Sequence, residues 1–190
     1  MVAYPDRKLL TAVIGVERAR AVGAGAGWSL QGDRPPSGSV HEHELVWTVP
    51  GVDGSIHFRP DTIAGFDYVV RGPGDAERME TEIERCFEIV SDDEIVDGLT
   101  SAEPLDRGWA VLALALSAAR VHEEALELLV RERLQDDDRA VRLDAILAAG
   151  YLNDRRWIPL LEIVAETDVD PEVAGEAGRI ARGLQVHAPE

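Results

Sequence analysis

The 190-residue sequence predicts an α+β protein, in which a small N-terminal antiparallel sheet with helices precedes a short α-solenoid of helix pairs. Two observations predict this class. Residues 40–71 contain three short segments in which apolar and polar side chains partly alternate, as in a meander with one covered face. The second half of the chain resembles itself when it is shifted by 32 residues, which is typical of stacked helix pairs.

These patterns divide the chain into three parts. We expect an α+β unit at residues 1–100, helical repeats at 101–185 and a tail at 186–190. The first part can be a domain of its own or a cap on the first helix of the solenoid, since a stack of repeats needs a cap. The sequence leaves both alternatives open.

The N-terminal elements follow from local patterns. We predict a helix from Pro5 to Ile14 or as far as Val22, because its apolar residues fall on one side. A glycine-rich run at residues 23–27 ends it, and residues 28–39, with two prolines, are expected to form a loop. The three strands are expected at residues 40–49, 55–59 and 66–71.

Two helices should follow the strands. Asp75 is a good N-cap for the first, whose inward side chains would include Met79, Ile83, Phe87 and Val90. The second opens with the capping-box pattern of residues 91–94. Its inward side chains would be Ile95, Val96 and Leu99.

The self-similarity of the second half rests on particular positions. A shift of 32 residues places Trp109 on Val141 and Val173, Ala113 on Ala145 and Ala177, and Leu128-Leu129 on Leu160-Leu161. The acidic residues 136–138 and the Asp170-Pro171 pair suit helix N-termini, where carboxylates accept unpaired N–H groups. Gly150 is predicted to end the middle helix.

The best repeat carries a recognisable pattern of residues: Arg139-Ala140-Val141-Arg142, Ala145, Ala148-Ala149, Leu152, Asp154 and Ile158-Pro159-Leu160-Leu161. It resembles HEAT-like (PBS-lyase-type) helical repeat proteins over residues 105–184, most closely over 136–165, and the resemblance ends before residue 100. The first repeat departs from the pattern, because its helix at 109–116 is apolar all round. The resemblance implies a protein-binding face built from the second helix of each pair.

On that face we expect eight partner-binding residues: Glu123, Glu124, Glu127, Arg131, Arg155, Arg156, Trp157 and Glu162. An exposed tryptophan among arginines is a plausible binding hot spot. The alternative is that Trp157 belongs to the core, and its helical spacing with Leu160, Leu161 and Val164 favours the core.

The composition limits the classes of partner. The net charge is −17, from 36 acidic and 19 basic residues, which disfavours direct binding to nucleic acid and to anionic membranes and suits a basic protein. The same charge is also explained by solubility alone. The longest uncharged apolar run, residues 108–119, is too short to span a bilayer, and the N-terminus lacks a convincing signal peptide. A single cysteine, Cys86, is compatible with a reducing cytoplasm and is expected to be a buried small side chain.

One cluster of residues has metal-ligand chemistry. His41 and His43 would share one face of a strand, and His57 on the neighbouring strand could lie beside them. Such imidazoles could hold zinc or another divalent ion, although the helical zinc-protease pattern is lacking and no other cofactor is indicated.

Three functions therefore remain. The first, which we favour, is a non-catalytic protein–protein interaction module. The second is an acidic inhibitor or immunity-type protein that neutralises a basic toxin or nucleic-acid enzyme. The third is a metal-dependent enzyme that uses His41, His43 and His57.

Overall fold

The computed structural model describes residues 7–37, 43–117 and 123–188, and the chain divides into two compact units, Met1–Val90 and Ser91–Glu190. The first unit combines strands and helices. Its elements are β1 (Arg7–Leu9), α1 (Gly15–Gly25), β2 (Ser29–Arg34), β3 (Glu44–Thr48), β4 (Ile56–Asp61), β5 (Phe66–Arg71) and α2 (Ala76–Cys86).

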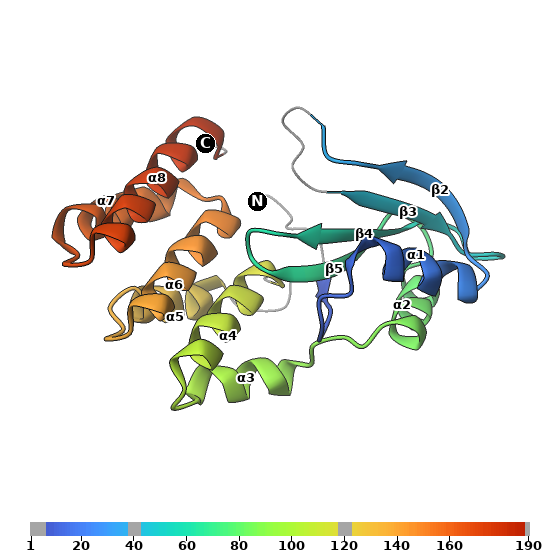
Figure 1. Ribbon diagram of the computed structural model, residues 1–190, viewed down its shortest axis with the longest axis horizontal. Helices are drawn as coiled ribbons and strands as arrows, with labels where there is room; N and C mark the ends of the chain where they lie inside the picture. Colours follow the sequence, from blue (N-terminus) through green and yellow to red (C-terminus); the bar gives the residue numbers. More distant parts are fainter. Residues whose placement is uncertain (1–6, 38–42, 118–122, 189–190) are drawn as a thin grey trace. The chain divides into compact units, whose positions relative to one another are not determined.

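The strands of the first unit form a five-stranded antiparallel sheet in the order β1-β5-β4-β3-β2 (Figure 1). The three central strands are the predicted meander. Val46 of β3 pairs with His57 of β4, and His57 pairs with Val70 of β5. Because side chains alternate along a strand, this register decides which polar side chains share a face.

Helices α1 and α2 cover one face of the sheet. Ala19 of α1 and Ile83 of α2 belong to the same buried cluster as Trp47, Phe58 and Val69 of the strands. α1 lies very close to the sheet, since a Cβ at Gly23 would lie 2.6 Å from the indole Nε1 of Trp47. The predicted helix after the N-cap Asp75 forms as α2 and buries Met79 and Ile83. It ends at Cys86, so Phe87 and Val90, which were predicted on the same helix, are buried beyond its end.

Two predictions for the N-terminal segment are wrong. Residues 7–9, expected in a helix, form β1 because they pair with residues 68–70 of β5, and the helix begins only at Gly15. Residues 29–34, expected in a loop, form the edge strand β2, which pairs with β3 across an irregularity between Leu30 and Gly32. Both segments are strands because of a distant partner, which local patterns do not contain.

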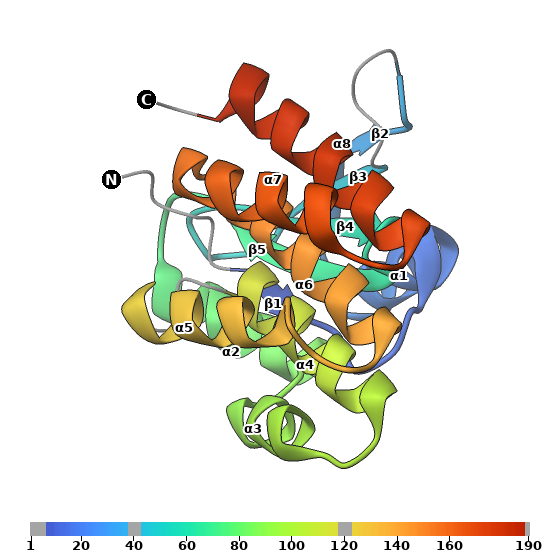
Figure 2. The same cartoon turned by 90° about the vertical axis from the view of Figure 1, so that its left-hand side faces the viewer.

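The second unit contains only helices and the turns between them in its described residues. Its elements are α3 (Asp92–Thr100), α4 (Pro104–Leu116), α5 (Glu123–Arg133), α6 (Arg139–Leu152), the 3-10 helix η2 (Arg155–Trp157), α7 (Ile158–Thr167) and α8 (Pro171–His187). The first helices α4, α6 and α8 pack on one another in succession, with α5 and α7 as the second helices of the pairs (Figure 2). No helix in the described part of the chain has the length and apolar character needed to cross a membrane.

The predicted helix N-termini are confirmed. Ser91 and Glu94 form the capping box of α3, while Asp138 and Asp170 accept backbone N–H groups at the starts of α6 and α8. Two finer predictions fail. Val96 of α3 is exposed rather than inward. Gly150 lies within α6, which ends at Leu152 and has Asn153, in the left-handed conformation, as its C-cap.

An arginine–aspartate contact joins consecutive repeats. Arg107 of α4 places Nε and Nη2 3.2 and 3.1 Å from the carboxylate oxygens of Asp136, and Arg142 of α6 binds Asp168 in the same way at 2.8 and 3.1 Å. Hydrogen bonds from Arg107 hold the pKa of Asp136 below its ordinary value. Both arginines also donate to the carbonyl groups of the turn before their own helix. Asp136 thereby fixes the turn before α6 against α4, and Asp168 fixes the turn before α8 against α6.

These contacts correct the predicted spacing of the repeats. Arg107 and Arg142 are equivalent and lie 35 positions apart, as do the N-cap residues Glu103 and Asp138. The shift of 32 residues holds only between α6 and α8, whose N-caps are Asp138 and Asp170. The first repeat is therefore three residues longer than the second, and the predicted match of Trp109 to Val141 is wrong.

Candidate functional site

The second helices α5 and α7 present one buried and one solvent-facing side. Leu126 and Val130 of α5 are buried, as are Leu161 and Val164 of α7. This helical spacing leaves the opposite side of both helices free of core contacts. The predicted partner-binding residues belong to these two helices and to the short helix η2.

The structure brings four of the predicted residues together. Glu127 of α5 accepts hydrogen bonds from Nε and Nη2 of Arg131 at 2.9 and 2.8 Å, and Nη1 of Arg156 lies 3.5 Å from its other oxygen. Arg156 also pairs with Asp154 at 2.9 Å. The guanidinium of Arg131 lies 5.9 Å from the ring centroid of Trp157, a cation–π distance. This cluster ties α5 to the start of α7.

Trp157 is a core residue. Its side chain is only 1% exposed, which confirms the core alternative and makes it a support beneath Arg131 rather than a surface anchor. Among the described residues its indole N–H has no hydrogen-bond partner. A partner protein would therefore meet the charged groups above the indole and not the indole itself.

Two more predicted residues hold the end of α8. Arg155 donates to the backbone oxygens of Ala188 and Gln185, both at 3.2 Å, and Gln185 donates to Glu162 at 3.1 Å. Arg155 thus satisfies carbonyl groups that the helix end leaves unpaired. Glu123 and Glu124 lie in the first turn of α5, and their side chains are outside the described part of the structure.

Two exposed aliphatic residues on the same side were not predicted from the sequence. Leu128 is 69% exposed and Ile163 is 55% exposed. They lie 35 positions apart, next to Glu127 and Glu162, which are also 35 apart, so both pairs occupy equivalent positions in consecutive repeats. A shift of 35 instead of 32 would have revealed them. We call Glu127, Leu128, Arg131, Arg156, Glu162 and Ile163 the second-helix surface.

His43 and His57, two of the three predicted metal ligands, contact different carboxylates. Val46 pairs with His57, so His57 shares a face of the sheet with Val46 and with Glu44, two residues before Val46. His43 is the neighbour of Glu44 and therefore faces the other way. His57 Nδ1 is 3.0 Å from Glu44 Oε1, and His43 Nε2 is 2.6 Å from Asp33 Oδ1. His41 lies outside the described residues, and within them no group of three potential ligands is placed to hold a metal ion.

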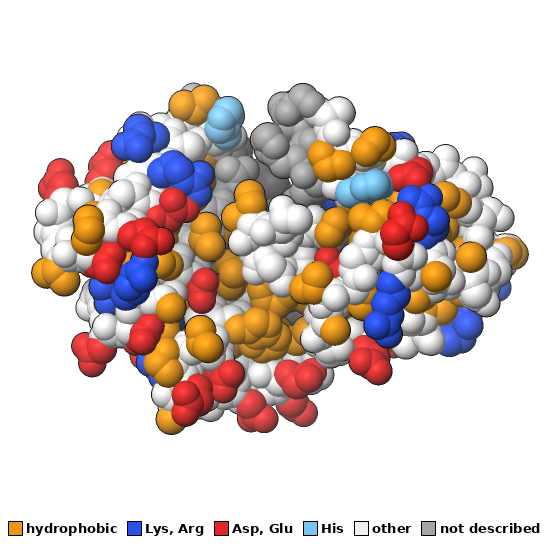
Figure 3. Space-filling model, in the orientation of Figure 1, with side chains coloured by type: hydrophobic (Ala, Val, Ile, Leu, Met, Phe, Trp, Pro, Cys, Tyr) orange, Lys and Arg blue, Asp and Glu red, His pale blue; other side chains and the backbone are white. Residues whose placement is uncertain are grey.

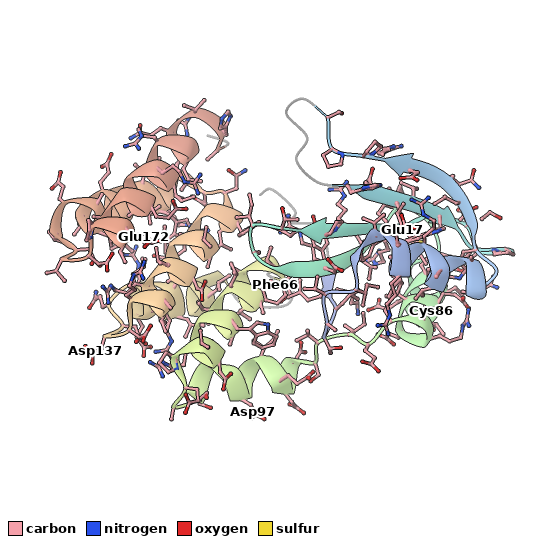
Figure 4. The ribbon with its side chains drawn as sticks, in the orientation of Figure 1. Glu17, Phe66, Cys86, Asp97, Asp137 and Glu172 are labelled. Atoms are coloured by element: carbon pink, nitrogen blue, oxygen red, sulfur yellow. The ribbon has the colours of Figure 1, made fainter. Side chains whose placement is uncertain are left out.

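Cys86 is poorly suited to act as a nucleophile. It is the last residue of α2, is labelled in Figure 4, and packs partly buried against the core of the sheet. Burial raises the pKa of its thiol, which opposes formation of the thiolate.

Comparison with known protein families identifies the helical segment. Residues 93–180 match the family model described as HEAT repeats. Comparison with curated proteins and with solved structures found no match. The segment is therefore a HEAT-like helical repeat, and HEAT repeats generally mediate protein–protein interaction.

Proposed function

We propose that this chain is a protein–protein interaction module that binds its partner through the second-helix surface, by shape and charge rather than by bond chemistry. The observation that carries the proposal is the pair Leu128 and Ile163, two exposed aliphatic side chains at equivalent positions of consecutive repeats. Apolar side chains surrounded by charged groups are typical of the centre and rim of a protein interface.

The repeat framework supports a preformed surface. The Arg107–Asp136 and Arg142–Asp168 contacts fix the turns of the repeats, and Trp157 supports the charged cluster from below. A surface held in this way loses little conformational freedom when a partner binds. Side chains on it need only small adjustments.

The charge of the helical unit supports a basic partner. Residues 91–190 contain 22 acidic and 10 basic residues, so this unit carries −12 of the total charge of −17. Figure 3 shows acidic side chains over α3, where Asp92, Asp93, Glu94 and Asp97 are exposed. On the second-helix surface itself, Arg131 and Arg156 already pair with Glu127, while Glu162 is exposed. A basic partner would be steered by this field and released by salt.

The inhibitor or immunity-type alternative is a special case of the same proposal, in which the basic partner is a toxin or a nucleic-acid enzyme. Only the identity of the captured protein separates the two. A reducing compartment such as the cytoplasm suits either function, because Cys86 is a free thiol.

The test is affinity capture from a lysate at low and moderate salt, with the double variant Leu128→Ser/Ile163→Ser. We expect the parent to retain a basic protein that salt releases and the double variant to lose it at least about tenfold. The matched control is Leu105→Ser/Val169→Ser, which removes two aliphatic side chains that are 76% and 95% exposed elsewhere on the unit. Capture that both double variants weaken equally, or no captured protein at all, would refute the proposed surface.

A further inference from the structure

A chain of three hydrogen-bonded side chains lies on the sheet of the first unit. Ser55 precedes β4, His57 lies in β4 and Glu44 begins β3. The hydroxyl Oγ of Ser55 is 2.8 Å from His57 Nε2, and His57 Nδ1 is 3.0 Å from Glu44 Oε1. The function proposed for the helical unit does not use these groups.

The ring nitrogen of His57 that carries the proton follows from its contact with Glu44. Burial alone would raise the pKa of Glu44, but hydrogen bonds from His57, Arg59 and Arg34 outweigh it and lower that pKa to about 2. A carboxylate can only accept, so the neutral ring of His57 must carry its proton on Nδ1. His57 Nε2 is then an acceptor, and it faces the hydroxyl of Ser55.

Two arginines hold the carboxylate in place. Arg59 Nε donates to Glu44 Oε1 at 2.9 Å, and Arg34 Nη1 donates to Glu44 Oε2 at 2.6 Å. Both carboxylate oxygens of Glu44 are therefore occupied, which fixes the oxygen that orients the imidazole. A base oriented by a fixed third group is the arrangement that activates serine nucleophiles.

The space beside the hydroxyl depends on a glycine. A Cβ at Gly72, the residue after β5, would lie 2.3 Å from Ser55 Oγ and 3.4 Å from His57 Nε2. Ser55 itself is half-buried. Any larger residue at position 72 would displace the serine–histidine pair.

We propose that Ser55 is a nucleophile toward small acyl esters, with His57 as its general base and Glu44 as a positioning residue. The observation that carries this proposal is the Ser55–His57–Glu44 hydrogen-bond chain, with Glu44 held by two arginines.

The reaction is balanced without a metal or a redox partner. Ser55 Oγ forms a bond to the ester carbonyl carbon while His57 Nε2 takes the hydroxyl proton. The ester C–O bond then breaks, and the leaving alcohol receives that proton, which leaves an acyl-serine. Water repeats the sequence: His57 takes its proton, its oxygen bonds to the acyl carbon, and Ser55 leaves with the proton as the acid is released.

The experiment is covalent labelling of the full chain with diisopropyl fluorophosphate, followed by intact mass and peptide mapping. We expect a single diisopropylphosphoryl group on Ser55, with loss of fluoride. Ser55→Ala should abolish labelling, and His57→Gln should slow it about 100-fold. Ser29→Ala, which removes an exposed hydroxyl from the edge strand β2, is the matched control and should label like the parent.

A second measurement tests the substrate class. The parent should hydrolyse p-nitrophenyl acetate faster than buffer does, and Ser55→Ala should reduce the rate to that of buffer. Equal thermal melting curves of the parent and the variants will show that folding is intact. An unlabelled parent, a label on another residue, equal labelling of His57→Gln, or hydrolysis that survives Ser55→Ala would overturn the proposal.

Discussion

Asp144 of α6 is a partly buried acid at the contact between two first helices, and replacing it with asparagine should stabilise the protein. Its carboxylate lies against α4, since a Cβ at Gly108 would lie 2.1 Å from Asp144 Oδ2. Burial raises the pKa of Asp144 from 3.8 to about 6. The folded protein therefore holds a carboxylate that is easier to ionise after unfolding.

The pH dependence follows from the two pKa values. Below about pH 4 the acid is protonated in both the folded and unfolded states, so it does not affect stability. Between about pH 4 and 6 the unfolded state ionises first, and the free energy of unfolding falls until it levels off above pH 6. A difference of about two pH units corresponds to about 3 kcal/mol, and partial exposure of the side chain reduces this to about 1–2 kcal/mol.

Urea unfolding of Asp144→Asn and the parent at pH 4 and pH 8 measures this effect. We expect the variant to be more stable by about 1–2 kcal/mol at pH 8 and by less than about 0.5 kcal/mol at pH 4. The control Asp137→Asn changes an exposed aspartate in the turn before α6, labelled in Figure 4, and should change stability little at either pH. Equal gains at both pH values, or a loss at pH 8, would show that desolvation does not govern Asp144.

Three further variants test the packing. Ala145→Arg places a charged side chain at a fully buried position of α6 and should unfold the helical unit. The loss should be seen in far-UV circular dichroism, and a variant as stable as the parent would contradict the helix packing. Arg142→Gln should lower the free energy of unfolding in urea by about 2 kcal/mol, because it breaks the buried pair with Asp168. The control Arg179→Gln breaks an exposed pair within α8 and should lower it by less than about 0.5 kcal/mol. Gly23→Ala should lower the free energy of unfolding by about 1–3 kcal/mol because its Cβ would collide with Trp47. An unchanged midpoint of urea unfolding, followed by tryptophan fluorescence, would argue against that contact.

The sequence allowed the helical half to be predicted because its signals are local. Asp138 and Asp170 cap helices within the next three residues, and the alanines that face neighbouring helices recur at helical spacing. The spacing of the first repeat was misjudged because Trp109 could be superposed on Val141 without knowledge of the turn contacts. The pairing of Arg107 and Arg142 with their aspartates, together with the N-caps Glu103 and Asp138, shows that the shift is 35.

The sheet was only partly predictable because strand pairing is not local. β3, β4 and β5 follow one another and alternate in polarity, so they were found. β1 pairs with β5, about 60 residues away, and β2 is a polar edge strand whose pairing with β3 is irregular between Leu30 and Gly32. The Ser55–His57–Glu44 chain depends on the same register, so the sequence suggested the histidine but not its partners.

The second-helix surface was predicted in its charged residues and missed in its apolar ones. Helical spacing placed Glu127 and Arg131 on one side, but whether Trp157, Leu128 or Ile163 lies inward depends on the exact position of each neighbouring helix. The structure buries Trp157 and exposes the other two.

Photocrosslinking from position 163 tests the proposed binding surface most directly. A benzoylphenylalanine is placed at position 163 of α7 or, as the control, at position 169 after that helix, and each protein is irradiated in a lysate at low salt. We predict a single crosslinked protein from position 163, absent from position 169 and reduced when Leu128 is also changed to serine. The same crosslinked proteins from both positions, or none from position 163, would contradict the assignment of this surface as the binding site.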